Sequence, residues 1–165
     1  MTVTSSRTAL TFAALVLALI LIYTGISAKD KLTWLMEVTP VIIIVPLLLA
    51  IHSRYPLTPL LYVLIFFHAI ILMVGGMYTY AKVPIGFDVQ AWLGLSRNPY
   101  DKLGHFFQGL VPALALGQGA DDFLGTQGDP WDTQSDMFCA LLGALTTVFA
   151  LSRWHTKQLV NIQRP

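Results

Sequence analysis

Two polar side chains stand four positions apart where a polar connection gives way to an apolar stretch. They are Asp101 and His105, and this spacing places both on one face of a helix. A carboxylate and an imidazole in this arrangement can bind a divalent metal, or act as a base and the acid that orients it. The alternative is structural, with Asp101 capping the helix and His105 lying at the membrane interface.

A second group of acids precedes the last apolar stretch. Asp129, Asp132 and Asp136 are spaced at i, i+3 and i+7, so a helix that begins near Pro130 aligns the three carboxylates. Like charges repel unless a cation or a basic partner compensates them. The alternative is a proline at the first helical position, followed by acids at the positive end of the helix dipole. The candidate metal ligands are therefore Asp101, His105, Asp129, Asp132 and Asp136, and the candidate catalytic residues are Asp101, His105 and Asp132.

Two ionisable residues lie within apolar stretches. These intramembrane polar candidates are Glu37 and His68. Such groups are costly inside a bilayer and usually face the bundle interior with a partner. Direct pairing of Glu37 with His68 is one hypothesis; the alternatives are that Glu37 reaches the interface and that His68 is an ordinary hydrogen-bonded histidine of a bundle.

The elements that must position these residues are apolar helices. Of the 165 residues, 55% are hydrophobic and only 12% charged, with a mean hydropathy of +0.65, whereas soluble domains are about 25% charged. A helix needs about 20 mostly apolar residues to cross a bilayer. We predict an all-α, polytopic transmembrane bundle that forms a single integral membrane domain over residues 1–165. The five predicted apolar spans cover residues 10–26, 32–51, 57–77, 103–116 and 137–151.

The charge and cysteine content exclude several other classes of protein. A net charge of +1 with scattered Lys and Arg argues against a nucleic-acid-binding surface. A single cysteine, Cys139, excludes an internal disulfide framework and a multi-cysteine metal cluster. The polar segments are short, so we expect any function to reside in the bilayer or close to its surface.

The basic residues bear on the orientation of the chain. Five spans place Arg7 and Arg54 on one side and the other eight basic residues on the opposite side. This distribution predicts an external amino terminus and an internal tail. Six spans would divide the basic residues equally and give no guidance.

Several runs of the sequence resemble a known family. Residues 68–72, 75–84, 97–105 and 123–134, together with 37–40, are similar to the bacterial YjdF-type inner membrane proteins over nearly the whole chain. More distantly, Asp101, Lys102 and His105, with Asp132 and Asp136 followed by Gly143, look like the signature of VanZ-like membrane proteins, which are associated with glycopeptide-antibiotic resistance. The resemblance implies a multi-pass protein of the bacterial inner (plasma) membrane.

One departure from the family affects the candidate site. Members carry a further segment, including an apolar helix, between the parts that match residues 111–115 and 119–123, and here the two parts are joined almost directly. With six spans both acidic motifs fall on one membrane face. With five they fall on opposite faces, unless the helix over 103–116 enters and leaves at the same face.

Three functions are compatible with these features. The first is a membrane-embedded enzyme, assisted by a divalent metal, that acts on a lipid-linked or cell-envelope substrate. The second is a small transporter or ion- or proton-conducting protein that uses Glu37 and His68. The third is a non-catalytic membrane partner, or an inactive form that results from the internal deletion. The lipid bilayer is an expected partner in each case, and the sequence predicts no particular oligomer.

Overall fold

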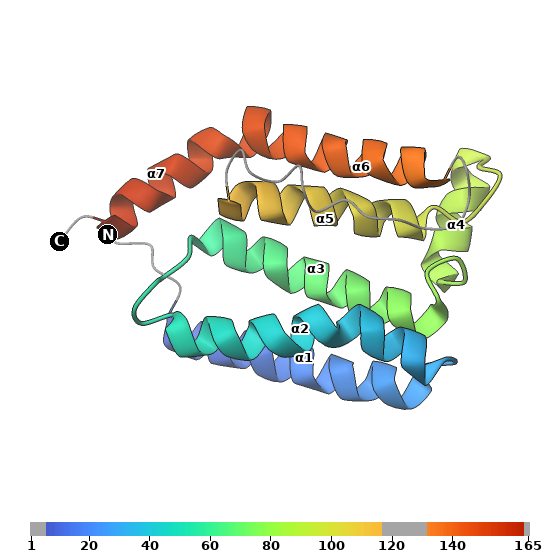
Figure 1. Ribbon diagram of the computed structural model, residues 1–165, viewed down its shortest axis with the longest axis horizontal. Helices are drawn as coiled ribbons and strands as arrows, with labels where there is room; N and C mark the ends of the chain where they lie inside the picture. The colour runs from blue at the N-terminus through green and yellow to red at the C-terminus, as the bar shows by residue number, and fades with distance from the viewer. Residues whose placement is uncertain (1–5, 117–131, 164–165) are drawn as a thin grey trace. The chain divides into compact units, whose positions relative to one another are not determined.

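The computed structural model describes residues 6–116 and 132–163. Within these ranges it describes only the backbone of Leu116 and of residues 132–136 and 162–163. The described chain is all-α, as predicted, with no β-strand in those ranges. Seven α-helices and one π-helical segment follow one another along these residues (Figure 1). They are α1 (Arg7–Ser27), α2 (Lys31–Ile51), α3 (Pro59–Tyr78), α4 (Pro84–Leu93), α5 (Tyr100–Leu116), α6 (Asp132–Thr146), η2 (Thr147–Leu151) and α7 (Ser152–Gln163).

Four described stretches are helical, long and apolar enough to cross a membrane: Arg7–Ser27, Lys31–Ile51, Pro59–Tyr78 and Met137–Asn161. The predicted span over 103–116 corresponds to α5, which has 17 residues. Two helices arise where the sequence indicated only polar segments. The connection before Lys102 contains α4, and the basic tail after Leu151 continues as α7.

The chain divides into two compact units. One contains α1, α2, α4, the second half of α3 and the first two residues of α5, and the other contains the rest of α5, α6, η2, α7 and the first half of α3. In the first unit, Asp30 caps α2, since its Oδ1 accepts hydrogen bonds from the backbone N–H groups of Leu32 at 2.9 Å and Thr33 at 3.2 Å. These bonds hold the pKa of the Asp30 carboxyl below its usual range. Lys31 donates from Nζ to the carbonyls of Gly25 and Ile26 at the end of α1, where a cation is favoured.

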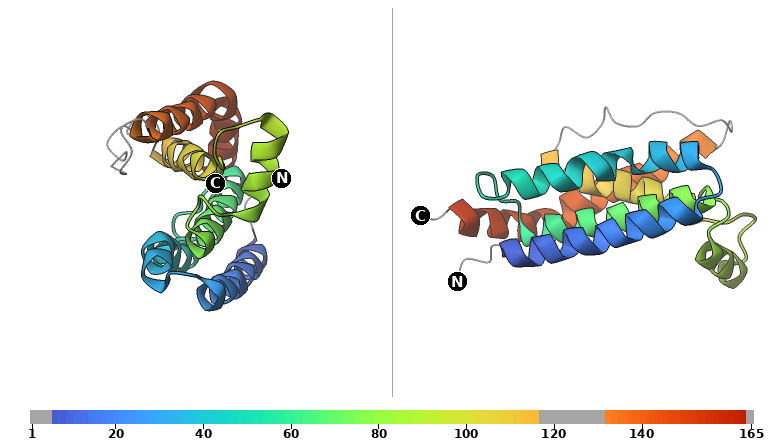
Figure 2. Two further views of the ribbon diagram at one scale, coloured as in Figure 1. Left: turned by 90° about the vertical axis from the view of Figure 1, so that its right-hand side faces the viewer. Right: turned by 90° about the horizontal axis from the view of Figure 1, so that it is seen from below.

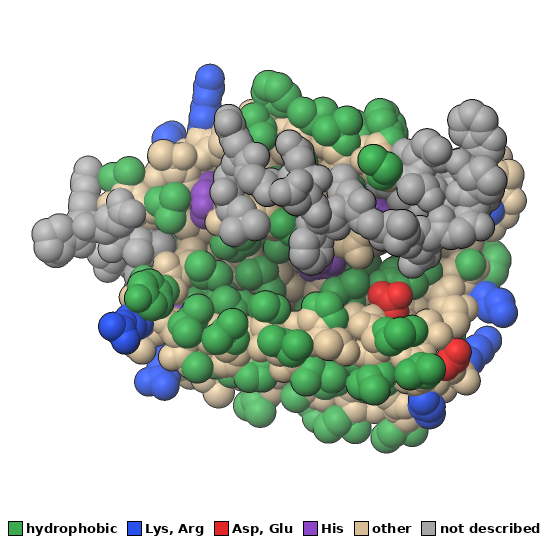
Figure 3. Space-filling view, viewed as in Figure 1, with side chains coloured by type: hydrophobic (Ala, Val, Ile, Leu, Met, Phe, Trp, Pro, Cys, Tyr) green, Lys and Arg blue, Asp and Glu red, His purple; other side chains and the backbone are tan. Residues whose placement is uncertain are grey.

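The outer faces of α1 and α2 are apolar. Phe12, Leu19 and Ile26 of α1 are 68%, 68% and 76% exposed. Figure 3 shows hydrophobic side chains along this hairpin, with Lys and Arg side chains gathered near its ends. Such a surface is suited to lipid tails and not to water.

In the second unit, α5 and α6 lie side by side and run in the same direction (Figures 1 and 2). Glycines allow the close approach. A Cβ on Gly109 would lie 2.8 Å from Ala140 Cα, and a Cβ on Gly143 would lie 2.8 Å from Leu110 N. Thr147 Oγ1 also donates to the Leu110 carbonyl at 3.0 Å. Small residues at the contact therefore bring the two backbones together.

The last helix, α7, is attached to the beginning of α3 by side-chain hydrogen bonds. His155 Nδ1 lies 2.9 Å from Thr58 Oγ1, and Gln158 Oε1 accepts a hydrogen bond from Leu60 N at 3.2 Å. The first N–H groups of a helix have no partner within that helix. Gln158 therefore supplies an acceptor that the first turn of α3 lacks.

Candidate functional site

The amino end of α5 is fixed by Asn98, which is 5% exposed. Its Oδ1 accepts a hydrogen bond from Tyr100 N at 3.0 Å, and its Nδ2 donates to the Val83 carbonyl at 2.9 Å. Asn98 thus supplies the side-chain acceptor that caps the start of α5. The sequence alone offers Asp101 as the residue for this capping role. Sequence reasoning did not assign this role to Asn98, although an Asn-Pro pair before a helix is a recognisable turn signal.

Asp101 lies in the first turn of α5 and forms an ion pair. Its Oδ2 accepts a hydrogen bond from Arg97 Nη2 at 3.5 Å, with the two side chains 23% and 41% exposed. His105 lies one turn further along α5, and its Nδ1 is 2.7 Å from Gln108 Oε1. Both candidates are therefore already oriented by neighbours on the same segment of chain.

The second acidic motif lies at the beginning of α6. Asp132 is the first residue of that helix, and the backbone of Asp136 follows one turn later. Asp129 lies outside the described residues, as do the side chains of Asp132 and Asp136. No three His, Cys, Asp or Glu side chains come close enough to hold a metal ion among those that the structure describes.

Parallel packing places the two motifs at corresponding positions of neighbouring helices. Asp101 and His105 lie in the first two turns of α5, and Asp132 and Asp136 lie in the first two turns of α6. Because the two helices run side by side in one direction, their amino ends lie at the same end of the pair (Figure 1). Both ends carry the positive pole of a helix dipole, which favours carboxylates there.

The intramembrane candidate Glu37 has a hydrogen-bond donor that sequence reasoning did not assign to it. Glu37 Oε2 on α2 accepts a hydrogen bond from Tyr80 Oη at 3.1 Å. The Tyr80 ring lies 6.1 Å from the ring of Tyr100, and the Tyr100 hydroxyl donates to the Ile71 carbonyl at 3.4 Å. Tyr100 is only 8% exposed, so its ring packs inside the first unit.

The turn that contains Tyr80 has an unusual backbone conformation. Thr79 and Tyr80 have φ values of 60° and 48°, a left-handed conformation that is uncommon for residues other than glycine. Tyr80 N donates to the Gly75 carbonyl at 2.8 Å, and Gly75 leaves room for the Tyr80 ring. The Gly75-Gly76 pair is the sequence signal for this close approach.

Burial controls the ionisation of the two tyrosines. It raises the pKa of Tyr100 to about 12, and burial together with the Glu37 carboxylate raises the pKa of Tyr80 further. A folded-state pKa above the unfolded value of about 10 contributes stability that is complete below pH 10 and is lost as the pH rises through the folded value.

We therefore expect a delayed tyrosinate signal. Titration followed by absorbance at 295 nm should give nearly the same curve for the wild type, Tyr80→Phe and Tyr100→Phe up to about pH 11, because neither residue ionises in that range. A loss of one full tyrosine amplitude below about pH 10.5 in either variant would show that the residue is not buried as described.

The other intramembrane candidate, His68, lies in α3. Its ring centroid is 6.0 Å from that of Phe107 on α5. The buried Nε2 atom has no hydrogen-bond partner among the described residues. Direct pairing of Glu37 with His68 remains a prediction. The contacts that the structure shows are those of Glu37 with Tyr80 and of His68 with Phe107.

Comparisons with known proteins agree with the sequence resemblance. The family model described as predicted membrane protein (DUF2238) matches residues 9–117 and 113–157. The inner membrane protein YjdF of Escherichia coli (strain K12) is 64% identical over 201 aligned residues, which cover 96% of each protein. The alignment is longer than this chain, and the two family matches meet near residue 115, which agrees with a missing internal segment. No solved structure matches the chain.

Proposed function

This chain belongs to the DUF2238 family of predicted membrane proteins, and from that premise we propose that it is a membrane-embedded enzyme acting on a lipid-linked or cell-envelope substrate with the help of a divalent metal. It is an integral, multi-pass inner-membrane protein. The single observation that carries the proposal is the parallel packing of α5 and α6, which brings the amino ends of two acid-bearing helices to the same end.

The chemistry follows from the residue types at those ends. Aspartate oxygens and a histidine nitrogen are ligands for divalent ions. A bound cation would relieve the repulsion among the carboxylates and supply a Lewis acid or an activated water. Asp101, His105 and Asp132 are the proposed catalytic residues, with Asp129 and Asp136 completing the set of ligands. Apolar helix faces beside this site would admit an amphiphilic substrate from the bilayer.

The direction of α5 and α6 also bears on topology. Two adjacent helices that cross a membrane in the same direction need a connection that returns across it, and an unpaired backbone is not tolerated in lipid. Family members meet this need with a further helix, which the sequence of this chain lacks between α5 and α6. The parallel arrangement is therefore compatible here with an α5 that enters and leaves the bilayer at the same face. It favours one face for both motifs over the opposite faces expected from five simple crossings.

The test is metal retention by the purified full chain. After incubation with Mg²⁺, Mn²⁺ or Zn²⁺ and removal of free ions, elemental analysis should find about one bound divalent ion per chain. His105→Ala and Asp132→Asn should each weaken retention about tenfold or more, because each removes a ligand.

Asp88→Asn serves as the matched control. Asp88 is an exposed acid on α4, and its substitution should leave metal retention unchanged. A wild-type chain that retains none of the three ions, or unchanged retention in both site variants, would contradict the proposal.

A further inference from the structure

One face of α7 is basic and has no acidic neighbours along the chain. Arg153 and Lys157 are both exposed and one helical turn apart. From Met137 to Pro165 the sequence contains no Asp or Glu. Neither cation has an ion-pair partner within the part of the chain that the structure describes. Two exposed positive charges on the same helix therefore lack an acidic partner among the described residues.

The length of the last apolar stretch places these charges at a membrane boundary. Met137–Asn161 comprises 25 residues, or about 37 Å at a rise of about 1.5 Å per residue. The hydrocarbon core of a bilayer is about 30 Å thick. If Met137 enters the core at one boundary, about 20 residues carry the helix across, and Lys157 lies at the level of the lipid head groups on the other side.

The attachment of α7 to α3 gives the same position independently. Pro59–Tyr78 has 20 residues, which is about 30 Å of helix and matches the core. Its first turn, at one boundary, is the turn contacted by His155 and Gln158. These hydrogen bonds fix the rotation of α7, so Arg153 and Lys157 do not move freely relative to the beginning of α3.

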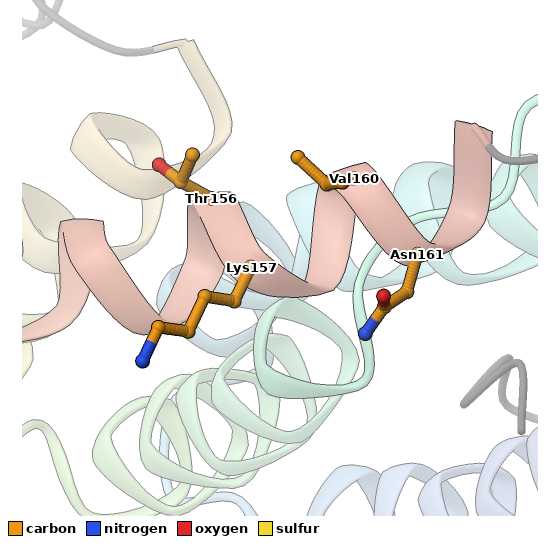
Figure 4. Close-up of a pocket in the computed structure, with 4 residues that line it drawn as sticks. All are labelled: Thr156, Lys157, Val160 and Asn161. Carbon is orange, nitrogen blue, oxygen red and sulfur yellow. The ribbon is translucent and has the colours of Figure 1, made fainter.

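A shallow hollow of about 380 Å³ lies on α7 and is lined by Thr156, Lys157, Val160 and Asn161. Lys157 and Asn161 point to one side of the helix, and Thr156 and Val160 point to the other (Figure 4). Polar donors thus line one part of the hollow and an apolar side chain lines another. Phe149, two turns nearer the membrane interior, is 79% exposed.

We propose that this face of α7 binds the head groups of anionic phospholipids. Arg153 and Lys157 would donate charge-assisted hydrogen bonds to the phosphate, with the Asn161 amide as a neutral donor. The acyl chains would run toward the membrane interior along Phe149. A water-soluble acidic partner is less favoured, because Trp154 and Phe149 are 55% and 79% exposed and suit the interface and core of a bilayer.

Lipid-specific quenching of a fluorophore on the full chain tests this proposal. In a Cys139→Ala background, Phe149→Cys is labelled and the protein is reconstituted in phosphatidylcholine–phosphatidylglycerol vesicles, with brominated acyl chains on one lipid or the other. We expect brominated phosphatidylglycerol to occupy the site at 149 about 25-fold better, since each of the two basic residues near the membrane surface contributes about fivefold and the two factors multiply. The combined variant Arg153→Gln/Lys157→Gln should reduce this preference to within about twofold of equality, as should about 0.5 M salt.

Two controls separate a specific site from a general surface effect. A label at Leu19→Cys, on the exposed middle of α1, should be quenched equally by the two lipids. Lys82→Gln removes one exposed charge elsewhere and should leave the preference at 149 unchanged. Equal quenching at 149 in the charged protein would overturn the proposal and leave an acidic protein segment as the occupant. A preference that survives Arg153→Gln/Lys157→Gln would also overturn it.

Discussion

Replacing Gly143 by leucine should separate α5 from α6 and remove most of the stability of that helix pair. A Cβ at this position would meet backbone atoms of α5, including Leu110 N at 2.8 Å. A side-chain rotation cannot relieve a clash with backbone, so the helices themselves must move. That movement would also break the hydrogen bond from Thr147 Oγ1 to the Leu110 carbonyl at 3.0 Å.

The expected sign is opposite to that of an ordinary glycine in a helix. Glycine to alanine normally stabilises a helix by about 1 kcal/mol. At Gly143 even alanine should be destabilising, and leucine should lower the free energy of unfolding by about 3 kcal/mol, at the upper end of the usual effect of overpacking. Gly109→Leu, whose Cβ would meet the Ala140 backbone, should behave in the same way.

The measurement is unfolding of the purified chain in mixed detergents, followed by circular dichroism. Ala150→Leu provides the matched control, because Ala150 is exposed in the same stretch of chain and the same enlargement there meets lipid. Gly143→Leu with a stability within about 0.5 kcal/mol of that of Ala150→Leu would contradict the close contact between α5 and α6.

Gly75→Ala should destabilise the end of α3, and Tyr80→Ala should relieve that effect. A Cβ at position 75 would lie 2.8 Å from Tyr80 Cδ1 and closer to other atoms of the ring. The ring has little freedom to move, because its hydroxyl donates to Glu37 and its backbone N–H donates to the Gly75 carbonyl. We expect Gly75→Ala to lower the free energy of unfolding by about 2 kcal/mol.

A double-mutant cycle isolates this coupling. With Tyr80→Ala already present, Gly75→Ala should cost less than about 0.5 kcal/mol, because the obstructing ring is gone. Tyr23→Ala removes a tyrosine that is 63% exposed and should leave the cost of Gly75→Ala unchanged. Equal costs in the Tyr80→Ala and Tyr23→Ala backgrounds would show that Tyr80 does not pack against Gly75.

Local signals in the sequence were sufficient for the long apolar helices. Long apolar stretches predicted the helical bundle. In lipid every backbone N–H and C=O group must find a partner within the protein, and a helix satisfies these groups within one segment. Residues that cap or begin a helix were informative too. Asp30 begins α2 as a cap, and Pro84 occupies the start of α4, a helix that a reading based on hydropathy alone missed.

Contacts between distant residues could not be predicted in the same way. Hydropathy places Glu37 within a span and Tyr80 near an interface, but their hydrogen bond depends on two left-handed residues after α3. The close packing of α5 against α6, which run in the same direction, likewise depends on Gly109 and Gly143 meeting the opposite backbone. The count of basic residues for five spans assumes that successive predicted helices alternate in direction. The external amino terminus and internal tail that it gave remain a prediction.

A shared site requires the two acidic motifs to face the same side of the membrane. In a Cys139→Ala background, single cysteines are introduced at Ser96, just before α5, and at Thr133, in the first turn of α6. Intact and permeabilised cells are then treated with a membrane-impermeant maleimide. We expect both positions to react from the same side. Reaction from opposite sides would separate Asp101 and His105 from Asp132 and contradict a shared site.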